Sequence, residues 1–349
     1  MKRTIAILLS MMMCAGLLAG CGVAPAPSDA AASAAASAAQ PASEPAEPAA
    51  PAASATGAVP TGDKPIALLI PSPVGDPFIA LCVKGLEKLS EETGAELKII
   101  ETLDKAEYED QVRAMAELGA NPVYCMWGDL SELAVKVAPE YPDTKFILAD
   151  VYMKTNQPNV SSISVDPYAS SFIAGYIAAN STEVGKVGFI AHADRPVSRR
   201  YRDGFIAGVH YVDESIPVEV AYVGNDQDPV KGQEVAKLMI QNNGVDLIFQ
   251  SASRSGLGVI AGCADQGIKC IGSDDWQGDV DPCVFWSALK PFDEALYVEG
   301  KSVFDGTYES GDKAYGLEQG LPMYDQRDFD KLPEELQQGV LAVVEGIKS

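Results

Sequence analysis

Polar and aromatic residues gather at six places that closely follow short apolar runs. Each place offers a carboxylate, a ring, a guanidinium or a hydroxyl, and together they comprise Asp76-Pro77-Phe78, Trp127-Gly128-Asp129, Asp194-Arg195, Asp226, Ser253-Arg254-Ser255 and Asp274-Asp275-Trp276. Flat rings combined with carboxylates and a guanidinium suit a small polar ligand with an aromatic or sugar face. Asp and Ser also cap helices, so each residue alone is consistent with a structural role. The whole set favours a binding site.

Little in the chain could carry out covalent chemistry. There are two histidines in 349 residues, His192 and His210, which leaves few candidates for a zinc site or a Ser-His-Asp triad. Asp274 and Asp275 are adjacent, so in extended chain their carboxylates point to opposite sides and do not form a catalytic pair. We therefore expect a protein that binds its ligand without catalysis, cofactor or metal.

Beyond Lys64 the chain alternates short apolar runs with segments of helical periodicity. The predicted strands are Ile66–Ile70, Leu97–Ile100, Val123–Met126, Phe146–Ala149, Val187–Ile190, Val218–Val223, Leu247–Phe249 and Lys269–Ile271. The predicted helices are Ile79–Leu89, Tyr108–Leu118, Leu130–Ala138, Ala169–Ala179, Tyr201–Val212, Pro229–Gln241 and Gly256–Gln266. This repetition predicts an α/β fold with doubly wound, mostly parallel sheets, which bind ligands at the carboxyl ends of their strands.

One glycine-rich segment has the pattern of a dinucleotide-binding fingerprint. Gly256-Leu257-Gly258-Val259-Ile260-Ala261 follows a predicted strand, opens a predicted helix and precedes Asp274 by almost twenty residues. The fingerprint usually opens the first strand-helix unit, whereas this segment lies deep in the chain. We therefore expect no nicotinamide cofactor, and we interpret the glycines as a helix start whose backbone N–H groups approach a ligand.

The charge balance limits the partners. Acidic residues outnumber basic ones by 49 to 26, giving a formal net charge of -23 at neutral pH. This argues against a nucleic-acid partner, because phosphate binding requires clusters of Lys and Arg. Hydrophobic residues make up 47% of the chain, which is enough for two lobes with their own cores.

The first 63 residues are not expected to join the fold. A basic pair precedes an apolar stretch from Ile5 to Leu18, and Leu18-Ala19-Gly20-Cys21 ends in cysteine, as in a bacterial lipoprotein signal. We expect residues 1–20 to be removed and Cys21 to carry the lipid. Residues 21–63 are mostly Ala, Pro and Ser and predict a disordered tether. An uncleaved transmembrane helix is disfavoured, because the apolar run is shorter than a bilayer span.

Several later segments are similar to those of one known family. They are KVGFIAHADRPVSRRYRDGFIAG at residues 186–208, and EYPDTKFILAD, YVGNDQDPVKG, DLIFQSASRSGLGVI, SALKPFDEALY and AYGLEQG. Collinear from about residue 66 to the C-terminus, they resemble the basic membrane protein family, lipid-anchored substrate-binding proteins related to the purine nucleoside receptor PnrA. The resemblance implies a two-lobed, type I periplasmic-binding fold that closes on a purine nucleoside between its lobes. The N-terminal lobe is expected at residues 64–183, with part of 291–349 returning to it, and the C-terminal lobe at 184–290.

The resemblance implies two ligand contacts directly. The family's GVDSD segment, whose first Asp holds the ribose hydroxyls, matches residues 272–276, so Asp274 is the expected ribose ligand. A carboxylate accepts from two vicinal hydroxyls at once through strong, charge-assisted hydrogen bonds. The family's pocket lysine corresponds to Lys290, which is expected to donate to a ribose oxygen and to offset the charge of Asp274. A surface salt bridge is the alternative role for Lys290.

Other positions depart from the family pattern. After the first strand, Asp76-Pro77-Phe78-Ile79 keeps the family's Phe, shifts its Asp and loses its base-reading Asn. Asp226 stands where relatives have a stacking Phe, and Ser253-Arg254 replaces two glycines. Trp127 or Trp276 is expected to supply the missing ring. The expected ligand contacts are therefore Asp274, Lys290, Phe78, Asp76, Trp127, Asp226, Ser253, Arg254 and Trp276, and the departures leave the exact ligand open.

Two smaller features remain. Arg199-Arg200 belongs to the family signature, and the pair is expected either to hold the lobe together or to touch the ligand. Apart from the signal and Cys21, the cysteines are Cys82, Cys125, Cys263, Cys270 and Cys283, an odd number. Cys125 and Cys270 lie in strand-like runs and are expected to be buried, and a disulfide between Cys263 and Cys270 stays open.

We therefore expect a monomeric, lipid-anchored solute-binding protein on the extracytoplasmic face of the cell membrane, with an ABC permease and ATPase as partners. Two other classes stay open. An exported hydrolase would release free base from a nucleoside. A ligand sensor or surface lipoprotein would bind a different small polar or acidic metabolite without feeding a transporter, and a permease and ATPase encoded next to this gene would argue against it.

Overall fold

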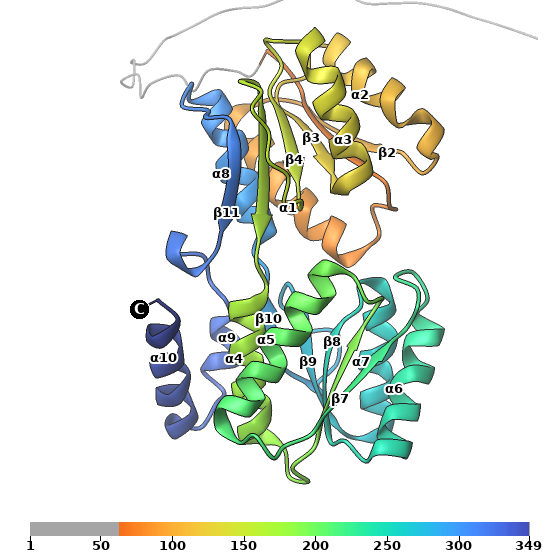
Figure 1. Ribbon diagram of the computed structural model, residues 1–349, viewed down its shortest axis with the longest axis vertical. Coiled ribbons are helices and arrows are strands. Elements are labelled where there is room, and N and C mark those ends of the chain that lie inside the picture. Colours follow the sequence, from red (N-terminus) through yellow and green to blue (C-terminus); the bar gives the residue numbers. More distant parts are fainter. Residues whose placement is uncertain (1–62, 349) are drawn as a thin grey trace, which may run out of the picture. The chain divides into compact units, whose positions relative to one another are not determined.

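The computed structural model describes residues 63–348, so the predicted signal sequence, Cys21 and nearly all of the predicted tether lie outside the described residues. Two β-sheets are each covered by helices on both faces (Figure 1). The predicted α/β class with parallel, doubly wound sheets is confirmed. Within residues 63–348, no helix has the length and apolar character needed to span a membrane.

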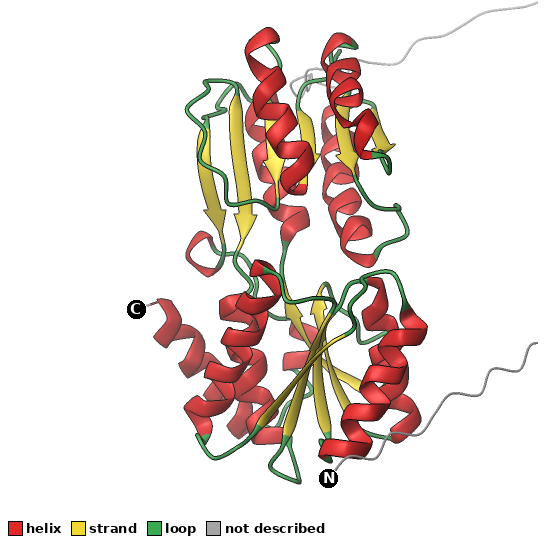
Figure 2. Cartoon of the chain, turned by 45° about the vertical axis from the view of Figure 1, so that its right-hand side comes forward, coloured by secondary structure: helices red, strands yellow, loops and turns green. Residues whose placement is uncertain are grey.

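The first sheet has six strands in the order β11-β5-β4-β3-β1-β2, and all neighbours run parallel. Its strands are β1 (Ile66–Ile70), β2 (Leu97–Glu101), β3 (Val123–Met126), β4 (Phe146–Ala149), β5 (Val160–Val165) and β11 (Gly311–Tyr315). One face is covered by α1 (Pro77–Thr93) and α8 (Phe292–Phe304), and the other by α2 (Tyr108–Glu117) and α3 (Trp127–Val137). In Figure 2 these helices, in red, lie on either side of the yellow strands.

Strand β1 shows why such apolar runs form central strands. All five residues of its sequence IALLI are fully buried. Ile66, Leu68 and Ile70 join the hydrophobic cluster beneath α1 and α8, whereas Ala67 and Leu69 join the cluster beneath α2 and α3. Since alternate side chains of a strand point to opposite faces, a strand covered on both faces needs a continuous apolar run.

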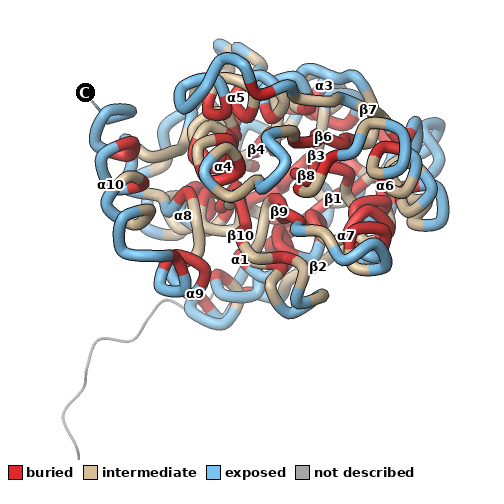
Figure 3. Tube along the Cα trace, turned by 90° about the horizontal axis from the view of Figure 1, so that it is seen from below, coloured by how far each residue is buried: buried red, intermediate tan, exposed pale blue. Residues whose placement is uncertain are grey.

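The second sheet has five parallel strands in the order β10-β9-β8-β6-β7. They are β6 (Val187–Ala191), β7 (Val218–Tyr222), β8 (Leu247–Ser251), β9 (Lys269–Asp274) and β10 (Val284–Leu289). Helices α4 (Tyr168–Ser181), α5 (Pro196–Val212) and α10 (Glu334–Lys348) pack on one face, and α6 (Pro229–Asn243) and α7 (Arg254–Gln266) on the other. Figure 3 shows the buried tube, in red, along the strands, and exposed stretches on the outer sides of helices such as α6 and α10.

We call the first sheet with α1, α2, α3 and α8 the first lobe, and the second sheet with α4 to α7 and α10 the second lobe. The chain passes between the lobes three times, after β5, after β10 and after β11. Helix α4 packs against α5 in the cluster of the second sheet. The first passage therefore lies at residues 166–167, ahead of the predicted boundary at residue 183. Helix α8 and strand β11 return to the first lobe, whereas α9 (Gln326–Phe329) and α10 belong with the second.

All eight predicted strands and all seven predicted helices are present, with ends that differ by up to five residues. Strands β5, β10 and β11 and helices α8, α9 and α10 were not predicted. Three short 3-10 helices span Lys105–Glu107, Ala138–Glu140 and Leu317–Gln319. The five cysteines within residues 63–348 are free thiols, and Cys125 and Cys270 are fully buried as expected.

The glycines of the segment Gly256–Ala261 allow close packing around helix α7. A Cβ on Gly258 would lie 1.7 Å from the carbonyl oxygen of Pro229, at the contact between α7 and α6. A Cβ on Gly256 would lie 2.0 Å from Oε1 of Gln250. Neither glycine lines the cavity described below. The expectation that backbone N–H groups of these glycines approach a ligand is therefore wrong, because the missing side chains make room for protein atoms and the N–H of Gly256 donates to Ala252 and Ser253.

Candidate functional site

A cavity of about 470 Å³ lies at the carboxyl ends of strands from both sheets. The first lobe contributes Phe78, Trp127, Gly128, Asp150 and Tyr152, the second contributes His192, Arg195 to Ser198, Tyr201, Asp226, Ser251, Ser253 and Asp274, and Lys290 comes from the passage after β10. The volume is in the range of small-molecule sites, about 300–1,000 Å³. Six of the nine predicted contacts, namely Phe78, Trp127, Asp226, Ser253, Asp274 and Lys290, are in this wall.

Backbone strain is concentrated at this cavity. Within residues 63–348, the non-glycine residues with positive φ are Trp127 (60°), Asp150 (58°), Ser253 (50°) and Asp274 (71°). All four line the cavity, and each follows or ends a parallel strand. Such conformations cost about 1–3 kcal/mol each and persist where the surrounding structure holds a functional side chain in place. The positions of backbone strain and the carboxyl ends of the strands therefore indicate the same cavity as the functional site.

Lys290 and Asp150 form a buried ion pair in the cavity wall. Nζ of Lys290 lies 2.6 Å from Oδ1 of Asp150, and the lysine is 2% exposed. The indole Nε1 of Trp127 donates to the other carboxylate oxygen at 3.2 Å. The ammonium also lies 4.6 Å from the ring centroid of Phe78. The direct ion-pair partner of Lys290 is thus Asp150, a residue that was not predicted, while its charge also acts on Asp274 as expected. Burial rules out the alternative of a surface salt bridge.

Asp274 presents a carboxylate to the cavity beside a tyrosine hydroxyl. The hydroxyl of Tyr201 donates to Oδ1 of Asp274 at 2.5 Å, and the hydroxyl of Ser273 donates to Oδ2 at 3.3 Å. Burial raises the pKa of Asp274, and the nearby charge of Lys290 opposes this shift. Burial also raises the pKa of Tyr201 well above its ordinary value, so the tyrosine remains a donor. The pair can accept hydroxyl hydrogens from a ligand at the remaining lone pairs of Asp274.

Two rings form the aromatic part of the wall. Phe78 at the start of α1 and Trp127 at the start of α3 are nearly parallel, with ring centroids 6.4 Å apart and an interplanar angle of 14°. Phe78 is 5% exposed and packs on Phe292 behind it. Of the two tryptophans expected to replace the family's stacking Phe, Trp127 lines the cavity. A flat ligand face can pack against this wall.

Asp76 caps helix α1 and accepts a hydrogen bond from the second lobe. Its Oδ1 accepts from the backbone N–H of Phe78 at 2.9 Å and of Ile79 at 3.4 Å, as an N-cap of α1. Its Oδ2 accepts from Nε2 of Gln227, in the loop before α6, at 2.9 Å. Asp76 is 2% exposed and outside the cavity wall. Both oxygens are occupied, so the predicted ligand contact is replaced by a cap that also links the lobes.

Trp276 and Arg254 are also outside the wall. Nε1 of Trp276 donates to Oδ1 of Asp328 at 3.0 Å, and the guanidinium of Arg327 lies 3.6 Å from its ring centroid. Both partners belong to α9, so the indole packs on that helix and not in the cavity. Arg254 is exposed at the start of α7, and its guanidinium lies beside Gly75 of the first lobe.

Several polar residues of the wall are not among the nine predicted contacts. They are Asp150, Tyr152, His192, Arg195, Ser198, Tyr201 and Ser251, of which only Arg195 belonged to a polar strand end noted in the sequence. Asp150 directly follows the predicted strand 146–149, so the strand-end argument could have found it. Tyr201 had no such signal, because it lies in the second turn of α5 and reaches Asp274 only through packing.

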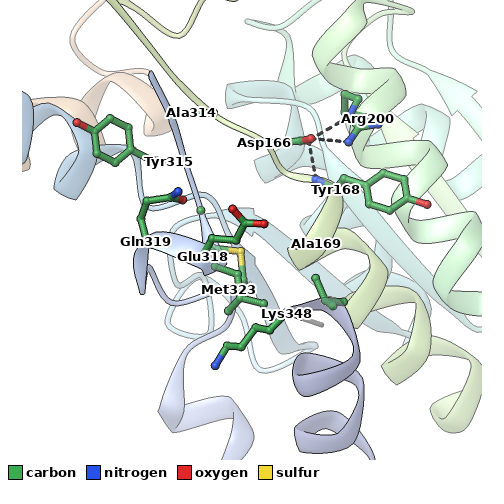
Figure 4. Close-up of a pocket in the computed structure, with 13 residues that line it drawn as sticks. Asp166, Tyr168, Ala169, Arg200, Ala314, Tyr315, Glu318, Gln319, Met323 and Lys348 are labelled. Carbon is green, nitrogen blue, oxygen red and sulfur yellow. Dashed lines mark hydrogen bonds and ion pairs between the residues drawn. The ribbon is translucent and has the colours of Figure 1, made fainter. Parts of the chain in front are cut away.

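The arginine pair of the family signature forms ion pairs outside the ligand cavity. Arg200 donates from Nε to Oδ1 of Asp166 at 3.0 Å and lies over the ring of Tyr168, 4.5 Å from its centroid. Figure 4 shows this contact at a separate hollow of about 280 Å³, beside the first passage between the lobes. Arg199 donates from Nε to Oδ1 of Asp194 at 2.8 Å. Neither arginine lines the ligand cavity.

Known proteins are similar to this chain in sequence or in fold. Basic membrane protein A2 of Borrelia garinii subsp. bavariensis is 26% identical over 273 residues, 76% of this chain and 80% of its own. The ABC transporter nucleoside-binding protein BmpA of Lactococcus lactis subsp. cremoris is 28% identical over 45% of this chain and 44% of its own. A crystal structure of an ABC transporter solute-binding protein from Aeropyrum pernix is 25% identical, with a TM-score of 0.66, and covers 81% of this chain and 86% of its own.

The family assignment rests on the length of the match. The family model described as ABC transporter substrate-binding protein PnrA-like matches residues 64–348. That range contains both sheets, the passages between the lobes and every residue of the cavity wall. The predicted resemblance is confirmed, and the chain belongs to the PnrA-like family of ABC transporter substrate-binding proteins.

Proposed function

We propose that this chain is the extracytoplasmic, lipid-anchored receptor of an ABC importer and that it captures a nucleoside between its lobes. The observation that carries the proposal is the cavity at the strand ends, where a carboxylate from one lobe faces an aromatic wall from the other. The Lactococcus lactis relative named as nucleoside-binding supports the ligand class. Nothing in this role requires the ligand to be changed chemically.

The ribose and the base would be held by different lobes. Asp274, positioned by Tyr201, would accept from the vicinal ribose hydroxyls, and Lys290 would donate to a ribose oxygen while keeping Asp150 as its counter-ion. The base would pack on Phe78 and Trp127 of the first lobe. Because each lobe contributes part of the contact, the ligand stabilises the closed arrangement over the open one.

Contacts between the lobes would support this closure. Gln227 of the second lobe donates to Asp76 of the first at 2.9 Å, and Nζ of Lys84 on α1 lies 3.8 Å from Asp275. The ion pair is solvated on both sides, with side chains 63% and 49% exposed, so its contribution is small. Such weak links allow the lobes to separate when the ligand leaves, as a transport cycle requires.

The membrane anchor is proposed from the sequence alone. Cleavage before Cys21 and lipidation of its thiol would fix the chain to the outer side of the cell membrane, and residues 21–63 would act as the tether. Globomycin, which blocks lipoprotein signal cleavage, tests this part. Accumulation of a larger precursor with an intact signal is expected, and an unchanged mobility would contradict the anchor.

Calorimetric titration of the purified full chain tests the binding role. Inosine, adenosine, uridine, free hypoxanthine and ribose are titrated in turn, with free base measured by chromatography afterwards. A nucleoside is expected to bind more tightly than its base or its sugar alone, without release of base. Failure of all nucleosides to bind would overturn the ligand class, and accumulation of free base would support the hydrolase alternative. Loss of nucleoside uptake on deletion of the gene would separate an importer subunit from a sensor.

A further inference from the structure

A helix N-terminus lies at one end of the cavity and offers hydrogen-bond donors there. Helix α5 begins there, and its N-terminal residues Arg195, Pro196, Val197 and Ser198 all line the cavity. The N-cap residue is Arg195, which supplies no side-chain cap. Helices α1 and α6, by contrast, are capped by the carboxylates of Asp76 and Asp228. The start of α5, a helix of 17 residues, therefore faces the cavity uncapped.

Two buried serine hydroxyls in the same wall have no partner. Ser198, in the first turn of α5, is 1% exposed, and Ser251, at the end of β8, is 6% exposed. Within residues 63–348, neither Oγ has a hydrogen-bond partner. Ser251 pairs in the sheet with Ala191, next to His192, so it belongs to the same corner as the loop that leads into α5. Burying a hydroxyl without a hydrogen bond costs free energy. A ligand oxygen that accepts from these hydroxyls would remove that cost.

Arg195 differs from the other arginines of its helix. Arg199 pairs with Asp194, Arg200 with Asp166, and Arg202 with Asp203. Arg195 has no ion-pair partner within residues 63–348, although the chain is strongly acidic. Its guanidinium can form a bidentate contact with a carboxylate or phosphate.

The carboxylates of the cavity do not fill this corner. Asp150 is neutralised by Lys290, and Asp274 accepts from Tyr201. Asp226, in the loop before α6, also lines the cavity, and within residues 63–348 its carboxylate has no hydrogen-bond or ion-pair partner. Its negative charge opposes an anion bound in the same cavity. The corner at α5 thus combines a free guanidinium, a helix N-terminus and two unbonded hydroxyls, which together match an acidic group of a ligand.

We propose that the N-terminal end of α5 is an anion subsite, in which Arg195, Ser198 and the first free backbone N–H groups hold a carboxylate or phosphate carried by the ligand. The inference rests on the proposed function and narrows it: the solute is an anionic nucleoside, acidic either at a sugar phosphate or at a carboxylated base. Ser251 completes the subsite from the neighbouring strand. Asp274 and the aromatic wall keep their roles toward ribose and base.

The experiment is a calorimetric titration of the full chain with inosine, inosine 5′-monophosphate, orotidine and inorganic phosphate. At least one anionic nucleoside is expected to bind tenfold or more tightly than inosine. Preference for the monophosphate identifies a phosphate group, and preference for orotidine identifies a carboxylate. Binding of inorganic phosphate alone as tightly as any nucleoside would overturn the subsite as part of a nucleoside site.

Three variants locate the effect. Arg195→Ala and Ser198→Ala are each expected to weaken the anionic probe about tenfold to a hundredfold, as for hydrogen bonds to a charged group, with little change for inosine. Asp226→Asn is expected to strengthen the anionic probe. Ser198→Ala removes a hydroxyl without a partner, so the melting temperature without ligand should not fall, and lost affinity then reflects lost contact. Arg199→Ala, which removes a neighbouring arginine outside the cavity, is the matched control.

The outcomes separate this proposal from the one it rests on. If inosine binds as tightly as the anionic probes, or if Arg195→Ala and Ser198→Ala leave the anionic affinity unchanged, the anion subsite is refuted while the nucleoside receptor stands. If no nucleoside binds, charged or neutral, both proposals fail together.

Discussion

Nζ of Lys290 lies 2.6 Å from Oδ1 of Asp150, in the wall of a cavity that draws residues from both lobes. Lys290 follows the last strand of the second sheet, and Asp150 follows a central strand of the first. The pair therefore links the end of a strand in one lobe to the passage that leaves the other lobe. Its energetic role can be measured without any ligand.

Asp150→Asn leaves the ammonium of Lys290 buried without a counter-ion. Removing one partner of a buried ion pair destabilises a protein by about 3–5 kcal/mol, and we expect a loss near the lower end because Asp150 is 14% exposed. Urea unfolding monitored by circular dichroism gives this difference. The double variant Asp150→Asn with Lys290→Met should recover most of the stability. Equal destabilisation by the single and double variants would show that the charge is not the cause.

Asp274 is expected to reduce stability in exchange for binding. Its pKa is raised by burial, so the folded state holds the proton more tightly than the unfolded state. The resulting penalty is present above the folded pKa and disappears as the pH falls through the folded pKa toward the unfolded value of about 3.9. Asp274→Asn should therefore raise the melting temperature at pH 7, by an amount that shrinks toward pH 4, and abolish tight nucleoside binding. A lower melting temperature at pH 7 would contradict this account.

His192 reports the electrostatics of the cavity. Burial lowers its pKa, and the charge of Arg195 lowers it further. Because the folded state resists protonation, this group's contribution to stability is lost as the pH falls below about 6.5. The chain has two histidines, so proton NMR resolves both imidazoles, and His210→Asn assigns them. Arg195→Ala should raise the pKa of His192, whereas an unchanged titration would place the guanidinium too far away to act on it.

The two tryptophans at strand ends should behave in opposite ways. Trp127→Ala removes a ring of the cavity wall and should weaken nucleoside binding about tenfold, by loss of a stacking contact worth about 1–1.5 kcal/mol. Trp276→Ala breaks the contacts with Asp328 and Arg327 and should lower stability while binding persists. Calorimetry and thermal unfolding of both variants give the comparison. Loss of binding in Trp276→Ala at full stability would restore Trp276 to the site.

The hydrogen bond between Gln227 and Asp76 should favour the closed arrangement. Gln227→Ala removes the contact between the lobes but leaves Asp76 as the cap of α1. A net hydrogen bond contributes about 1 kcal/mol, so ligand affinity should fall about fivefold with little change in stability. Small-angle scattering should show a larger radius of gyration without ligand. Asp228→Ala, which removes a cap of α6 outside the cavity, controls for general loosening of that loop.

The amino-acid sequence determined the central strands and the helices beside them. Runs such as IALLI are apolar at every position, and a strand covered on both faces needs that pattern. Strand β5 was not predicted because three of its six residues are serines, although Ser161, Ser162 and Ser164 are buried. The hydroxyl of Ser161 donates to Glu299 on α8, a helix that the chain reaches only after it has passed between the lobes twice. Strand β11, with the sequence GDKAY, was not predicted because it lies at a sheet edge, where alternate residues face water.

The sequence also determined that strand ends carry the polar residues, and six of the nine predicted contacts reached one cavity. Only the tertiary structure decided which of them share it. Asp76, Arg254 and Trp276 lie within a few residues of wall members, yet Asp76 caps α1, Arg254 is exposed at the start of α7 and Trp276 contacts α9. Asp150 and Tyr201 entered the site through packing. Local sequence sets where a backbone turns, but the direction of several site side chains depends on partners far away in the chain, such as Asp150 for Lys290, 140 residues apart.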